Sequence, residues 1–184
     1  VVNTAGPWAH VVGMMAELDL PAHPYRRQVF ITAPFSEVPR STPMTIDFAY
    51  NWYFRPEGEG LLTGMSDLAE PPSFNMTVDW DFMVEVIEHG VRRVPVLEEA
   101  RVIRGWAGLY SVTPDDQPIM GAIPGVEGAY CAVGFSGHGF MLSPATGLTL
   151  AECILDGCPQ TFDISEFTLE RFDGELSAGE EHVI

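Results

Sequence analysis

The segment AVGFSGHGFMLSPATG at residues 132–147 has glycines at positions 134, 137 and 139. Gly134, Gly137 and Gly139 leave the backbone nearly free of side-chain bulk. Glycine also adopts positive φ angles, so successive N–H groups can turn toward one bound group. This spacing therefore fits a loop that cradles an electron-rich ligand.

The flanking residues predict where that loop sits. The apolar stretch AYCAV at 129–133 predicts a strand before it, and Ser143 and Pro144 read as the N-cap and first position of a helix after it. The apolar run carries this helix as far as Gly157. A helix N-terminus would add a positive dipole end to the loop. A tight turn without a ligand explains the glycines equally well, since they match neither a Walker loop nor a dinucleotide fingerprint.

Composition predicts a packed globular chain. Of its 184 residues, 46% are hydrophobic and 19% are charged, which allows one sizeable domain or most of a two-layer unit. The 26 acidic and 9 basic residues give a net charge of −17, which argues against nucleic acid or an anionic membrane surface as partner. No apolar run approaches the length of a membrane span, and no segment resembles a signal peptide.

The cysteines and histidines predict neither a disulfide framework nor a metal site. Three cysteines (Cys131, Cys153, Cys158) are an odd number and lie in or beside apolar elements. That pattern fits packed thiols in a reduced intracellular protein. The five histidines show no ligand spacing. The chain opens on VVNTAG without an initiator methionine, so we expect a fragment of a longer protein.

The first half of the chain predicts a strand, a helix and a β-rich block. A strand should end at Ala5-Gly6, with Pro7 opening a helix. The apolar residues expected to form the buried face of that helix are Trp8, Val11, Val12 and Met15. Residues 25–35 read as a strand, and residues 44–65 as strands joined by a hairpin turn at RPEGEG.

The second half adds a helix, a long strand and an irregular end. Residues 78–90 predict a helix capped by Asp79. Its expected buried face is Trp80, Met83, Val84 and Ile87. Residues 100–114 predict a long strand, 115–125 a loop, and 162–172 an irregular tail ending in mobile acidic residues. Interleaved helices and antiparallel-type strands make the fold class α+β, that is, mixed α/β.

Four segments together, in this order and spacing, resemble one family. They are VVNTAGPWA, YFRPEGEGLLTG, GWAGLYSVTPDDQPIMG and GAYCAVGFSGHGFMLSPATG. They are similar to the second half of flavin-dependent amine oxidoreductases of the D-amino-acid-oxidase superfamily, from residue 1 to about residue 172. The nearest branch holds the sarcosine oxidase β subunit, dimethylglycine dehydrogenase and proline dehydrogenase.

This resemblance implies an antiparallel substrate-domain sheet with helices. The last strands and C-terminal helix of a split, Rossmann-like FAD-binding domain would complete the chain. The implied domains are the end of the FAD-binding domain (1–18), the substrate domain (19–110), the return to the FAD-binding domain (111–160) and a C-terminal tail (161–184). The family's dinucleotide fingerprint G-x-G-x-x-G does not occur in this sequence, as expected if the first half is missing.

The resemblance also implies FAD as cofactor and assigns residues to it. Ala5 and Gly6 would lie near the FAD pyrophosphate. The residues that would lie along the pyrimidine edge of the flavin are Gly134, Ser136, Gly137, His138, Gly139, Phe140 and Met141. N–H groups there would stabilise the charge of the reduced flavin. His138 could donate to the cofactor or to a loop carbonyl. Asp115 and Asp116 lie in the family's TPD loop, where we expect a solvated turn.

Tyr53, Arg55 and Tyr110 are the implied substrate-binding residues, although Arg55 could instead pair with an acid and hold the hairpin. Some family members bind the substrate carboxylate with a lysine or an arginine where this sequence has Met141 and Tyr110. Leu62 stands where oxidases of the family carry a lysine for oxygen activation, which favours a dehydrogenase.

The expected function is FAD-dependent oxidation of a small secondary or tertiary amino acid of the sarcosine, dimethylglycine or proline type. Hydride would pass to flavin N5, and no catalytic base is identified. Expected partners are the amino-acid substrate, the missing N-terminal Rossmann half, and an electron acceptor or other subunits. The expected location is the cytoplasm, or the mitochondrial matrix in a eukaryote. Two alternatives remain: oxidation of a hydroxy acid of the 2-hydroxyglutarate type, and an inactive fragment serving as a structural or assembly module.

Overall fold

The computed structural model describes residues 1–173, which form two compact units. The first unit contains residues 1–25 and 110–173, and the second contains residues 26–109. The chain passes between the units within two strands, β2 (His23–Thr32) and β6 (Val102–Val112). The family resemblance implies the corresponding boundaries at 18/19 and 110/111.

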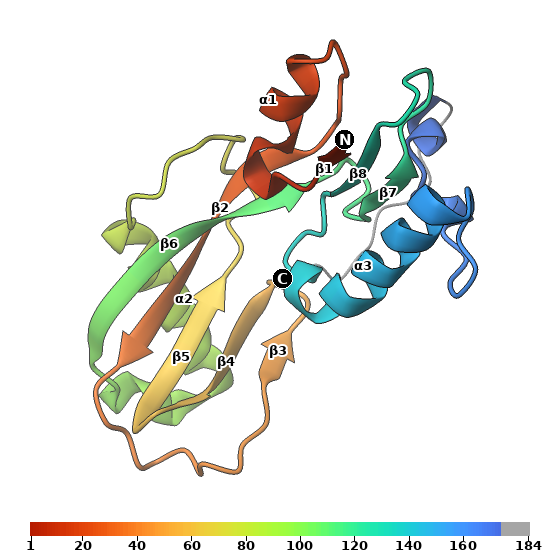
Figure 1. The fold of residues 1–184 in the computed structure, drawn as a ribbon. Coiled ribbons are helices and arrows are strands. Elements are labelled where there is room, and N and C mark those ends of the chain that lie inside the picture. The colour runs from red at the N-terminus through yellow and green to blue at the C-terminus, as the bar shows by residue number, and fades with distance from the viewer. Residues whose placement is uncertain (174–184) are drawn as a thin grey trace. The chain divides into compact units, whose positions relative to one another are not determined.

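The second unit is built on a five-stranded sheet (Figure 1). Its strand order is β3-β4-β5-β2-β6, with β3 at Thr45–Asp47, β4 at Trp52–Glu57 and β5 at Gly60–Met65. The pairs β3–β4, β4–β5 and β2–β5 are antiparallel. The hairpin predicted at RPEGEG is confirmed, because Glu57 pairs with Gly60 across a two-residue turn.

The helix α2 (Trp80–Arg93) contacts β4 and β5 and is followed by the short 3-10 helix η2 (Pro95–Glu99). Its predicted cap is confirmed, because the Asp79 carboxylate accepts hydrogen bonds from the N–H groups of Asp81 and Phe82 at 3.0 Å. These bonds satisfy donors that a helix start otherwise leaves free.

The predicted buried face of α2 is wrong at Trp80 and Val84, whereas Met83 is partly buried against the core cluster. The buried residues of α2 are Phe82, Val86, His89 and Gly90, whereas Trp80 and Val84 are about half exposed. The packing of α2 on Trp52 of β4 explains which face is buried. Because Gly90 has no side chain, the Trp52 ring lies 2.9 Å from the position that a Cβ on Gly90 would occupy. Phe82 and Val86 join Trp52 in one core cluster.

The first unit contains a three-stranded sheet in the order β1-β8-β7. Here β1 (Val2–Asn3) is parallel to β8 (Tyr130–Val133), and β7 (Ile119–Ala122) is antiparallel to β8. The prediction of a loop over 115–125 is wrong at β7, because this short apolar run pairs along the full length of β8. The helix α3 (Gly139–Leu155) packs on β7 and β8 (Figure 1).

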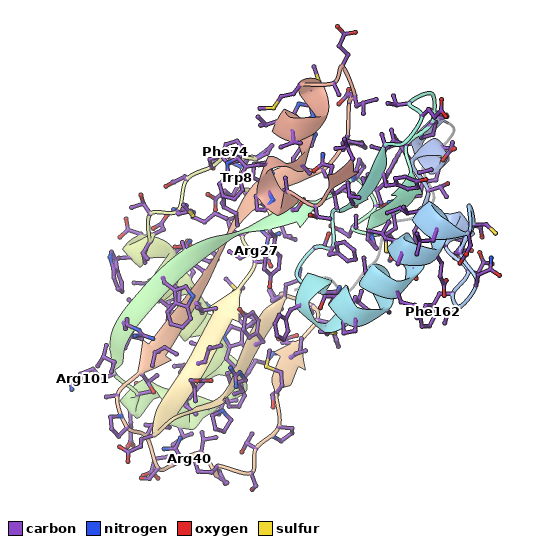
Figure 2. The ribbon with its side chains drawn as sticks, in the orientation of Figure 1. Trp8, Arg27, Arg40, Phe74, Arg101 and Phe162 are labelled. Carbon is purple, nitrogen blue, oxygen red and sulfur yellow. The ribbon has the colours of Figure 1, made fainter. Side chains whose placement is uncertain are left out.

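The helix after β1 is short, and its buried residues differ from those predicted. It comprises the 3-10 helix η1 (Gly6–Trp8) and α1 (Ala9–Met14). The predicted buried residues Trp8, Val11, Val12 and Met15 are all exposed; Trp8 is labelled in Figure 2. The buried positions are Ala9 and Gly13. A Cβ on Gly13 would lie 2.6 Å from the Leu18 carbonyl oxygen, so close backbone approach requires this glycine.

The chain after α3 forms two 3-10 helices, η3 (Ser165–Phe167) and η4 (Leu169–Asp173). Leu169 and Phe172 pack against the core of the first unit. The acidic end predicted to be mobile lies outside the described residues. All three cysteines are free; Cys131 and Cys153 are buried, but Cys158 is exposed rather than packed. Within residues 1–173, no helix combines the length and apolar character needed to cross a membrane.

Candidate functional site

The glycine loop follows directly after β8 and has an unusual backbone. Positive φ angles occur at Gly134 (74°), Ser136 (49°) and Gly137 (99°). Ser136 is a rare non-glycine residue in this region. It is buried, and its N–H group donates to the carbonyl oxygen of Ser111 at 3.0 Å. Such conformations persist only where the surrounding structure holds them.

The end of β6 holds this loop through three contacts. The Tyr110 ring lies where a side chain on Gly137 would be, 2.5 Å from the ideal Cβ position, and the Thr113 methyl group lies 2.3 Å from that position on Gly134. The hydrogen bond from Ser136 to Ser111 lies between them. Residue 110 contacts residue 137, residue 111 contacts residue 136, and residue 113 contacts residue 134, so the two segments run antiparallel. Packing within the unit thus accounts for glycine at 134 and 137.

The loop leads straight into α3, whose start differs from the prediction. The helix begins at Gly139, four residues before the predicted cap Ser143, and Pro144 lies inside it. Proline has no N–H for the carbonyl of Phe140, but the Ser143 hydroxyl donates to that oxygen at 2.8 Å. The serine therefore compensates for the proline, and the helix extends back to the loop.

The first N–H groups of α3 have no acceptor within their own helix. His138 occupies the N-cap position, but its side chain caps no backbone N–H group. The first backbone bond of the helix runs from Leu142 to His138, so the N–H groups of Gly139, Phe140 and Met141 have no partner within the helix. The residues Phe140 and Met141 are 95% and 70% exposed. This end of the 17-residue helix suits an electron-rich group.

Ala5 and Gly6 lie at the same sheet edge as the loop. Because β1 and β8 are parallel neighbours, with Asn3 beside Cys131, their carboxyl ends meet at one edge. Gly6 has a φ of 53°, and among the described residues no atom beyond its two chain neighbours lies within 4 Å of the position of a Cβ there. Unlike Gly134 and Gly137, this glycine has open space beside it. Ligands of open α/β sheets bind outside the carboxyl ends of the strands.

Tyr53 and Arg55 lie in the second unit, on one face of β4. The Tyr53 hydroxyl lies 2.5 Å from the position of a Cβ on Gly64, so this ring crosses β5. Arg55 pairs with Glu57 at 2.6 Å and is half exposed. This ion pair within the hairpin corresponds to the structural alternative for Arg55. Leu62 lies opposite Arg55 in β5.

Asp115 contradicts the prediction of a solvated turn. Its carboxylate is buried and accepts two hydrogen bonds from the Arg171 guanidinium, at 2.6 and 2.9 Å. The N–H group of Gln117 also donates to it at 3.1 Å. Burial acts to raise the pKa of Asp115, but the hydrogen bonds and the charge of Arg171 hold that pKa below its ordinary value. Sequence patterns did not predict this partner, because Arg171 lies 56 residues away from Asp115 in sequence.

The family model for FAD-dependent oxidoreductases named DAO matches residues 1–153. The chain belongs to the DAO family of FAD-dependent oxidoreductases. This match confirms the predicted superfamily, the oxidoreductase class and FAD as the cofactor of the family. The sites described above fit that cofactor in two respects: an open backbone at Gly6 and uncapped donors at the start of α3.

Two curated relatives and one solved structure illustrate this DAO membership. The chain is 35% identical to FAD-dependent oxidoreductase domain-containing protein 1 of Xenopus laevis, over 94% of this chain and 38% of the relative. It is 31% identical to mitochondrial sarcosine dehydrogenase of Mus musculus, over 96% of this chain and 20% of the relative. The chain thus spans about two fifths or less of these relatives. L-proline dehydrogenase from P. horikoshii is 34% identical with a TM-score of 0.85, covering 96% of this chain and 48% of that chain, which confirms the fold class.

The expected DAO site residues are divided between the two units. Ala5, Gly6, the loop residues and Tyr110 belong to the first unit, whereas Tyr53 and Arg55 belong to the second. Their roles toward cofactor and substrate stay predictions. Two further residues at the loop were not anticipated, Thr113 and Ser111. The hydroxyl oxygen of Ser111 is buried without a hydrogen-bond partner in the described part of the chain.

Proposed function

We propose that this chain forms the flavin-facing wall of an enzyme that oxidises a small secondary or tertiary amino acid. The observation that carries the proposal is the shared edge of the parallel strands β1 and β8. There, Gly6 and the glycine loop follow adjacent strand ends, and the uncapped start of α3 follows the loop. An FAD-binding half with a dinucleotide fingerprint would complete the site.

Bound FAD would supply the hydride acceptor at N5 of its flavin. This chain would supply orientation and electrostatics. N–H groups at the start of α3 would stabilise the negative charge that gathers at N1 and the C2 carbonyl of a reduced flavin. The hydroxyl of Tyr110, whose ring is held against Gly137, would donate a hydrogen bond to the substrate.

The names of the relatives favour an amine over a hydroxy acid as substrate. Sarcosine and L-proline, which occur in these names, are both secondary amino acids. Leu62 at the position of the oxidase lysine favours transfer of electrons to a partner rather than to oxygen. A mitochondrial location gains support from the name of the sarcosine dehydrogenase, and a cytoplasmic location stays the alternative.

The test is an absorption titration with FAD, first with the 184-residue chain alone and then with an FAD-binding half added as a separate polypeptide. We expect the flavin bands to shift only when both polypeptides are present. Unshifted bands in an associated pair would overturn the flavin role of the loop and leave an assembly module.

A second assay identifies the substrate class. Sarcosine, dimethylglycine, L-proline and 2-hydroxyglutarate are added separately, without oxygen, to the reconstituted flavoprotein. Bleaching of the flavin bands by an amine supports the proposal. Bleaching by 2-hydroxyglutarate alone would replace it with the hydroxy-acid alternative.

A further inference from the structure

Arg171 is held by an unusually complete set of contacts in the first unit. Besides its two hydrogen bonds to Asp115, it donates to the carbonyl oxygens of Gln117 at 2.8 Å and Thr168 at 3.1 Å. Its guanidinium carbon lies 4.2 Å from the centroid of the Phe172 ring. The Arg171 side chain is 13% exposed and that of Asp115 is 3% exposed. A buried guanidinium that binds a carboxylate through two hydrogen bonds fixes the position of that carboxylate, here the one of Asp115.

Asp115 in turn fixes Thr113, which is buried. The Thr113 hydroxyl lies 3.1 Å from the Asp115 carboxylate and 2.7 Å from the Gln117 carbonyl oxygen, and can donate to either acceptor. The methyl group on the same Cβ atom fills the space beside Gly134. Since hydroxyl and methyl share one rotamer, holding the hydroxyl also holds the methyl against the loop.

These contacts join the end of the described chain to the start of the glycine loop. We propose that Arg171 is a positioning residue for the glycine loop, acting through Asp115 and Thr113 on Gly134. The inference rests on the proposed function, because the loop matters only if its donors face a flavin. Loosening the loop would weaken hydrogen bonds to the reduced flavin, so the reduction potential would fall and FAD would dissociate faster.

The experiment compares variants of the FAD-loaded protein that contains this chain and its FAD-binding half. Arg171→Gln removes the cation, Arg171→Lys keeps the charge, and Thr113→Val keeps a methyl group while removing the hydroxyl. Arg26→Gln is the matched control, because Arg26 forms a similarly buried pair with Glu70 in the second unit, at 2.7 Å and with side chains 11% and 8% exposed.

The readouts are the midpoint potential of the flavin, the FAD dissociation constant and the melting temperature. For Arg171→Gln, we expect a more negative potential and about tenfold weaker FAD binding. Thr113→Val should reproduce both the change in potential and the loss of FAD affinity. Arg171→Lys should show smaller changes than Arg171→Gln. The Arg171→Gln, Thr113→Val double variant should change both quantities by less than the sum of the two single variants. Arg26→Gln should lower the melting temperature without moving the potential.

The outcomes separate this inference from the proposed function. If Arg171→Gln and Arg26→Gln lower the melting temperature alike and neither moves the potential, Arg171 is only structural and the inference is wrong. An additive double variant would also overturn it. If the unmodified protein holds no FAD, the proposed function itself fails. Should Arg171→Gln not fold, the milder Arg171→Lys and Thr113→Val variants decide by the same readouts.

Discussion

The ring of Tyr110 occupies the space that a side chain on Gly137 would need, with a carbon of the ring 2.5 Å from the ideal Cβ position. Gly137 also has a φ of 99°, which side chains rarely allow. Two independent constraints thus act on one residue, and they tie the conformation of the loop to the end of β6.

Gly137→Ala should therefore destabilise the protein by about 1–3 kcal/mol, through both backbone strain and displacement of Tyr110. Chemical denaturation measures this free energy of unfolding. Gly147→Ala is the control, because Gly147 lies within α3 with no atom within 4 Å of its Cβ position. That control should be neutral or stabilising by up to about 1 kcal/mol. Equal effects of the two substitutions would contradict the role of the Tyr110 contact.

Gly6→Ala tests the open edge after β1. Since no atom of residues 1–173 beyond the chain neighbours lies within 4 Å of the Cβ position, the φ of 53° is what opposes the new methyl group. We expect a loss of stability of about 1 kcal/mol and a larger loss of FAD affinity, because the methyl group would occupy the space expected to receive the pyrophosphate. Melting temperature and FAD titration of the reconstituted protein measure the two effects. An unchanged FAD affinity would remove Gly6 from the cofactor site.

The Asp115–Arg171 pair should make stability depend on pH in acid. The pKa of Asp115 is lowered from 3.8 by its partners, so the ionised form binds them preferentially. The stabilisation is fully present above the unfolded pKa and is lost as the pH falls through the lower folded pKa. Urea unfolding of wild type and Asp115→Asn between pH 3 and pH 7 checks this. The advantage of the wild type should shrink below about pH 4; an advantage that stays constant into acid would contradict the pairing.

The hydroxyl of Ser143 should matter only while Pro144 follows it. Ser143→Ala leaves the Phe140 carbonyl without the bond at 2.8 Å and should cost about 1 kcal/mol. In a Pro144→Ala background, the restored N–H group can donate to that carbonyl, so Ser143→Ala should become nearly neutral. A double-mutant cycle of unfolding free energies measures this coupling. Additive effects would show that the hydroxyl does not substitute for the missing N–H group.

Local signals in the sequence predicted the elements better than their packing. The turn at RPEGEG and the cap at Asp79 depend on neighbouring residues, and the structure confirms both. The predicted buried face of α1 was wrong and that of α2 was wrong in part, because periodicity shows that a face is apolar but not which surface covers it. Trp80 and Val84 follow helical spacing, yet the sheet core takes Phe82 and Val86 instead.

For the candidate site, too, the sequence predicted the local features but not the contacts between distant residues. The glycine loop could be found from its composition, and the resemblance added FAD. The contacts that hold the loop could not be found, since they join residues far apart in sequence, such as Asp115 and Arg171. A serine at positive φ also has no sequence signature: Ser136 adopts it because Ser111 binds its N–H group.

The Asp115–Arg171 pair joins two parts of the chain that are synthesised at different times. Arg171 leaves the ribosome 56 residues after its carboxylate partner and after the whole glycine loop. Until then, Asp115 and Thr113 have no guanidinium to hold them. If Arg171 positions the loop as proposed, the loop gains its last support only when the chain is translated past η4. A nascent chain that stops earlier would then carry every loop residue without the Arg171 cation.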